Sequence, residues 1–63
     1  MTLEQLAAIQ PQLRAYAEAI RTLRKAFENA DGRVVKAECM AVAVACFKLG
    51  EAAEQESDQK YMQ

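Results

Sequence analysis

Large apolar residues recur along the first half of the chain at the spacing of one helix face. Their steps alternate between three and four residues, which is typical of a helix that packs lengthwise against another helix. The set is Leu6, Ile9, Leu13, Tyr16, Ile20, Leu23 and Phe27. Thr2 and Gln5 match a capping box at the start of a helix. We therefore predict a helical segment over residues 2–30.

Pro11 interrupts this segment, because a proline inside a helix loses one hydrogen bond and its ring clashes with the preceding turn. Two outcomes are open. Either a short helix ends near residues 10–11 and Pro11 opens the main helix, or one helix continues with a kink. The apolar spacing keeps its phase from Ile9 to Leu13, which favours the kinked helix.

A second apolar series follows in the other half of the chain, and its steps again alternate between four and three. Its members are Val35, Cys39, Val42, Cys46, Leu49 and Ala53. This series predicts a second helix over residues 34–55. Residues 31–33 form the predicted turn, in which Gly32 ends the first helix in a left-handed conformation and Asp31 caps the second.

Two further features concern the end of the second helix. Gly50 is followed by strong helix formers, so we interpret it as a close-packing position within the helix rather than a stop. Residues 57–63 are interpreted as a frayed tail.

A short turn makes the two helices antiparallel neighbours, so residue numbers that face each other sum to about 63. Both apolar series then meet in register, with Leu23 opposite Cys39 as one example. Lys25 falls near Glu38 in this register, and Arg14 falls near Glu51. The predicted fold is a single all-α domain over residues 1–63, an antiparallel helical hairpin whose first helix is kinked or broken near Pro11.

The run from Ala37 to Leu49 is too apolar for a helix that is covered on one side only, since Glu38 and Lys48 are its only charged residues. The hairpin contact leaves a second series of apolar residues on this helix, here called the apolar stripe. It consists of Met40, Ala43, Val44 and Phe47. We predict that a second copy of the chain covers this stripe and completes a four-helix bundle. A helix of a different protein, or residues 1–10 folding back, are the alternatives.

Composition offers little chemistry. The chain has 63 residues, a net charge of −1 and no histidine, and its cysteines lie on the apolar series, which predicts buried structural thiols. No pair of carboxylates is set in an apolar pocket. We therefore expect no catalytic residue, no metal, no cofactor and no small-molecule substrate, and we predict that the protein is not an enzyme.

Basic residues share one face of the first helix, here called the basic stripe. They are Arg14, Arg21, Arg24 and Lys25. Glu18 lies among them, which favours a solvated, salt-bridged helix face over a surface that grips RNA phosphates. In length and helical-hairpin plan, the chain resembles the small plasmid copy-number proteins that bind paired RNA loops. That resemblance implies a dimeric RNA-binding modulator, and it lies in the overall plan, without a shared residue motif.

No stretch reaches the length of a membrane span, and the first residues lack the pattern of a secretory signal. Two unpaired thiols favour the cytoplasm of its own cell or of a host cell. The sequence therefore predicts a homodimeric, non-enzymatic regulator or adaptor that binds a protein target, of the inhibitor or anti-activator type found in phages and mobile elements. The alternatives are an RNA-binding modulator that uses the basic stripe and a small secretion-type chaperone.

Overall fold

The computed structural model describes the backbone of residues 1–29 and 31–62, and the side chains of these residues through Asp58. It contains three helices, α1 (Leu3–Ala8), α2 (Gln10–Asn29) and α3 (Gly32–Met62). No strand occurs in these two ranges, so the predicted all-α class is confirmed for the part of the chain described.

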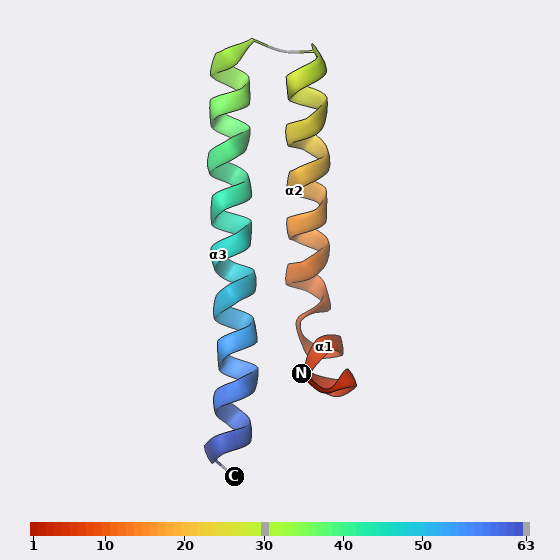
Figure 1. The fold of residues 1–63 in the computed structure, drawn as a ribbon, viewed down its shortest axis with the longest axis vertical. Coiled ribbons are helices and arrows are strands. Elements are labelled where there is room, and N and C mark those ends of the chain that lie inside the picture. Colours follow the sequence, from red (N-terminus) through yellow and green to blue (C-terminus); the bar gives the residue numbers. More distant parts are fainter. Residues whose placement is uncertain (30, 63) are drawn as a thin grey trace.

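α2 and α3 run side by side in opposite directions, and α1 lies at the end of the pair where α2 begins (Figure 1). The molecule measures 49 × 16 × 12 Å. Its radius of gyration is 14.6 Å, whereas a compact domain of this length has a radius of about 11 Å. The chain is therefore a thin layer of two helices, in which most residues reach solvent.

The first helical segment is broken at Pro11, and the kinked alternative is wrong. α1 ends at Ala8, and Ile9 leaves the helix with φ −100° and ψ 7°. Pro11 then lies in the first turn of α2, where its missing N–H costs no hydrogen bond. The apolar phase survives the break because Ile9 is buried at the corner, with 4% of its surface exposed. Its carbonyl accepts a hydrogen bond from the Leu13 N–H at 3.0 Å.

The predicted capping box starts α1. Thr2 Oγ1 accepts from the Gln5 N–H at 3.1 Å, and Gln5 Oε1 accepts from the Thr2 N–H at 2.8 Å. Gln5 has a second role, because its Nε2 donates to the Glu56 carbonyl at 3.3 Å. One side chain therefore both caps α1 and attaches it to the far end of α3.

Asp31 caps α3 as the sequence indicates, because its Oδ1 accepts from the N–H groups of Arg33 and Val34 at 3.0 and 3.3 Å. Gly32 is the first residue of α3 and does not have a positive φ, so its predicted left-handed conformation is wrong. Residues 32–33 of the predicted turn are helical instead. Ala30, the last residue of the predicted first helical segment, lies outside the described residues.

The contact between α2 and α3 keeps four of the six predicted residues of α3, but Glu38 and Ala45 are half-buried in place of Cys39 and Cys46. The half-buried residues of α3 are Val35, Glu38, Val42, Ala45, Leu49, Ala52, Ala53, Glu56 and Ser57. Cys39 and Cys46 are exposed, so the prediction of buried thiols is wrong. A small residue such as Ala45 at the contact lets two helices approach closely. On α2, Ala26 is buried and Phe27 is exposed, the reverse of the predicted order.

Charged side chains do not link the two helices in the expected way. The pairs expected between Lys25 and Glu38 and between Arg14 and Glu51 are not formed, and within the described ranges Arg21–Glu18 is the one ion pair. Its atoms lie 3.2 Å apart, both side chains are about two-thirds exposed, and both belong to α2. The α2–α3 contact is therefore held by apolar packing.

α3 extends past both predicted features of its second half. Gly50 lies inside the helix as expected, but nothing lies within 4 Å of the position a Cβ would take there, so the close-packing interpretation is wrong within one chain. The helix reaches Met62, so residues 57–62 of the predicted tail are helical. Gln63 lies outside the described residues.

Candidate interaction surface

The apolar stripe of α3 is exposed along its whole length. Met40, Val44 and Phe47 expose 64%, 52% and 67% of their surfaces, and Ala43 is exposed as well. The four residues recur at steps of three, one and three, which places them on one face of a helix. The structure therefore brings all four predicted residues together on a single solvent-facing surface.

This surface lies on the side of α3 that faces away from α2. Val35, Val42 and Leu49 face α2, and residues such as Met40 and Phe47 are about half a helical turn away from them. α1 does not cover the stripe, because its hydrogen bond to α3 is made at Glu56. Folding back of residues 1–10 over the stripe is therefore excluded.

The exposed surface of the whole chain is large for its mass. It amounts to 5129 Å², whereas a compact 7.0 kDa monomer exposes about 4,000 Å². The excess reflects the elongated shape of the molecule, in which two helices form one thin layer and leave their outer faces exposed to solvent.

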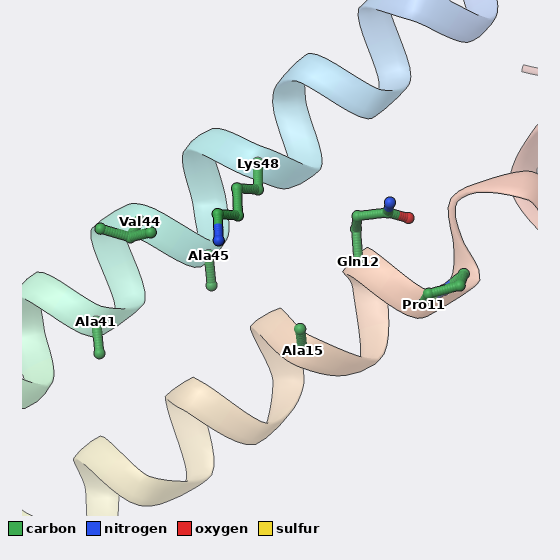
Figure 2. Close-up of a pocket in the computed structure, with 7 residues that line it drawn as sticks. All are labelled: Pro11, Gln12, Ala15, Ala41, Val44, Ala45 and Lys48. Atoms are coloured by element: carbon green, nitrogen blue, oxygen red, sulfur yellow. The ribbon is translucent and has the colours of Figure 1, made fainter.

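A groove between α2 and α3 borders the apolar stripe at Val44. Its volume is about 590 Å³, and its lining residues are Pro11, Gln12, Ala15, Ala41, Val44, Ala45 and Lys48. Figure 2 shows Ala15 of α2 and Ala41 and Ala45 of α3 pointing into the space between the helices. Apart from Val44, none of these residues was predicted as a site. The signal available in the sequence is the alanine pair Ala41 and Ala45, one helical turn apart.

Two polar groups border this apolar groove. The Gln12 side-chain oxygen is shielded from solvent and has no hydrogen-bond partner among the described residues. Lys48 lies on the facing helix and supplies a cation at the rim. The groove therefore offers a positive charge at its rim, whereas the shielded Gln12 oxygen is not accessible to an occupant.

All four residues of the basic stripe are exposed on α2. Arg21, Arg24 and Lys25 border a hollow of about 560 Å³ together with Tyr16 and Glu28, whereas Arg14 is not part of its lining. Arg21 donates a hydrogen bond to Glu18 at 3.2 Å. The stripe is therefore a mixed-charge surface, partly neutralised by acidic residues of the same helix.

The two cysteines do not form a chemical site. Both are free and exposed on α3. They are seven residues apart on one helix, or about 10 Å along its axis, so a disulfide between them is excluded.

In the described part of the chain, no three His, Cys, Asp or Glu residues gather in a way that would hold a metal ion. None of the helices there has the length and hydropathy of a membrane-spanning segment. Comparison with family models, with curated proteins and with solved structures gives no match to this chain.

Proposed function

We propose that this protein is a small, non-enzymatic regulator or adaptor that acts by binding protein, as a homodimer in the cytoplasm. The observation that carries the proposal is the exposure of Met40, Val44 and Phe47 on a helix face that no other part of the described chain covers. Contiguous exposed apolar surface of this kind marks interaction sites in proteins that work in water. Methionine beside an aromatic ring gives such a surface adaptable packing.

The proposed dimer is a four-helix assembly with both α3 helices at its centre. Because the apolar stripe lies opposite α2, each α3 then packs against α2 on one side and against the partner on the other. This arrangement suits a helix that is apolar nearly all round. The order of the helices is α2, α3, α3 and α2, so the assembly is a layer rather than a square bundle.

We place part of the contact with a protein target in the groove that borders the apolar stripe at Val44. An alanine-lined groove between two helices accepts an apolar helix face from a partner. Lys48 at its rim favours a target segment that carries a carboxylate beside its apolar residues.

The proposal is tested by capture of partners from cell lysate with three forms of the protein. These are the wild type, Phe47→Asp on the apolar stripe, and Arg14→Glu/Arg21→Glu on the basic stripe. A captured protein is then purified and its binding to each form is measured directly. We expect binding by the wild type and the basic-stripe variant and loss with Phe47→Asp. Equal binding by Phe47→Asp and the wild type contradicts the proposal.

A second candidate is a dimeric RNA-binding modulator, for which the basic stripe is the supporting observation. Arg21, Arg24 and Lys25 border one hollow beside the ring of Tyr16, which gives phosphate-binding cations close to an aromatic side chain. RNA binding that weakens steeply with salt, and that is lost in Arg14→Glu/Arg21→Glu but kept in Phe47→Asp, favours this candidate.

A further inference from the structure

The outer face of α3 changes character from one end to the other. Arg33 and Lys36 begin it, the apolar stripe occupies its middle, and Glu51 and Glu54 follow. All of these residues are exposed. Their spacing places them on the face of α3 that points away from α2. Along the helix, this face therefore reads basic, apolar and acidic.

A second α3 laid antiparallel on this face supplies its complement. When the two helices are centred between Ala43 and Val44, residue numbers that face each other sum to about 87. Met40 then faces Phe47 of the partner subunit, so a thioether meets an aromatic ring.

The same register pairs opposite charges at both ends of the contact. Lys36 faces Glu51 of the partner subunit, and Arg33 faces Glu54 of the partner subunit. Twofold symmetry repeats both pairs, which gives four pairs of opposite charge around an apolar centre. Hydrophobic and electrostatic terms therefore favour one and the same register.

We propose that the occupant of the apolar stripe is a second copy of this chain, bound through an antiparallel α3–α3 contact centred between Ala43 and Val44. This inference rests on the proposed function and specifies its dimer. A parallel contact is disfavoured, because it places Arg33 beside its own copy and Glu51 beside its own copy. Like charges in contact select against that alternative.

The charge pattern of the outer face favours a second copy over a different protein. A different protein would need a helix face that reads acidic, apolar and basic, and this chain already has that face when its direction is reversed.

The first test exchanges charge between two variants. Arg33→Glu/Lys36→Glu makes both ends of the outer face acidic, and Glu51→Lys/Glu54→Lys makes both ends basic. Each variant alone meets like charges in the proposed register, so its dimer affinity falls on the order of tenfold at low salt. An equimolar mixture regains the lost affinity as a one-to-one heterodimer. Sedimentation equilibrium measures all three samples.

The matched control is Arg14→Glu/Arg21→Glu, which makes the same change in charge on the outer face of α2 and leaves self-association unchanged. Circular dichroism checks that every variant keeps its helicity. Self-association of both α3 variants at wild-type strength, or a mixture that behaves as the sum of its parts, overturns the proposed register.

The second test is disulfide formation in a background with Cys39→Ser and Cys46→Ser. Val44→Cys places its thiol next to its own copy and forms a covalent dimer under mild oxidation. Glu54→Cys does not, because its two copies lie about 30 Å apart along the helices. A parallel contact cross-links both variants equally, and that result overturns the proposal.

These outcomes separate the register from the proposed function. If the wild type dimerises but the charge substitutions do not change dimer affinity, the register is contradicted and the proposed protein-binding regulator is not. A wild-type monomer that binds a protein target through Phe47 contradicts the second copy alone. A monomer that shows no binding dependent on Phe47 contradicts both.

Discussion

α2 and α3 pack against each other along one face, and their opposite faces are of different kinds. The outer face of α2 carries Arg14, Glu18, Arg21 and Lys25, which water solvates well. The middle of the outer face of α3 carries the apolar stripe, which water solvates poorly. Within the chain, α2 and α3 each contact the other and α1. The difference between them therefore lies in the polarity of their outer faces. The α2 face is polar and stays in water, whereas the apolar α3 face is the one that we propose to bind a partner.

The largest expected effect comes from placing a charge on the apolar stripe. Phe47→Asp removes a ring whose burial contributes about 2 kcal/mol, and a symmetric dimer contains two such rings. The dimer dissociation constant therefore rises by at least about a hundredfold. Sedimentation equilibrium measures the change, with Arg21→Asp on α2 as the control that stays dimeric. If Phe47→Asp keeps normal helicity and the wild-type dimer dissociation constant, the apolar stripe is not the dimer interface.

The next effect compares the inner and outer faces of α2. Leu23 is half-buried against α3, and Arg24 beside it is exposed. Leu23→Ala lowers the free energy of unfolding by about 2 kcal/mol, whereas Arg24→Ala changes it by less than about 0.5 kcal/mol. Urea unfolding followed by circular dichroism measures both variants at one protein concentration. Equal losses for the two variants contradict the assignment of the inner face.

A smaller effect concerns the attachment of α1. Gln5→Glu keeps an oxygen that accepts from the Thr2 N–H, but it loses the Nε2 that donates to the Glu56 carbonyl. One such hydrogen bond contributes about 1 kcal/mol. Amide hydrogen exchange over residues 3–8 therefore speeds up in Gln5→Glu while exchange in the middle of α2 stays the same. Unchanged exchange over residues 3–8 contradicts a role for Gln5 in holding α1 against α3.

The smallest effect is a stabilisation. Gly50 lies inside α3 with open space where a Cβ would be, so Gly50→Ala raises the free energy of unfolding by up to about 1 kcal/mol. Thermal unfolding of the variant and the wild type checks the sign. A lower unfolding temperature for Gly50→Ala shows instead that another chain packs closely against this position.

The sequence predicts the orientation of α2 better than that of α3, for a physical reason. On α2 the basic stripe and the large apolar residues occupy opposite sides, so only one face can turn inward, and the error at Phe27 and Ala26 is one residue. On α3 the run from Ala37 to Leu49 is apolar on nearly every side. Hydrophobicity alone therefore does not select between Cys46 and its neighbour Ala45 for the inner face.

The other predictions from the sequence succeed or fail according to how local the interactions are on which they depend. The capping residues Thr2 and Asp31 were identified correctly, because a cap depends on only a few neighbouring atoms. The break before Pro11 was one of two open alternatives, and the kinked helix was wrongly favoured because an apolar phase that continues across a corner looks the same as one that continues along a helix. For the candidate site, the sequence identified Met40, Ala43, Val44 and Phe47 as left over from the α2 contact. Their use as an interface stays a prediction.

The most direct test of the central claim is the mass of the unmodified protein in solution, measured by sedimentation equilibrium over a wide range of concentrations. Covering of the apolar stripe by a second copy predicts a species of twice the 7.0 kDa chain mass, whose abundance rises with protein concentration. A single 7.0 kDa species at every concentration up to the millimolar range contradicts it.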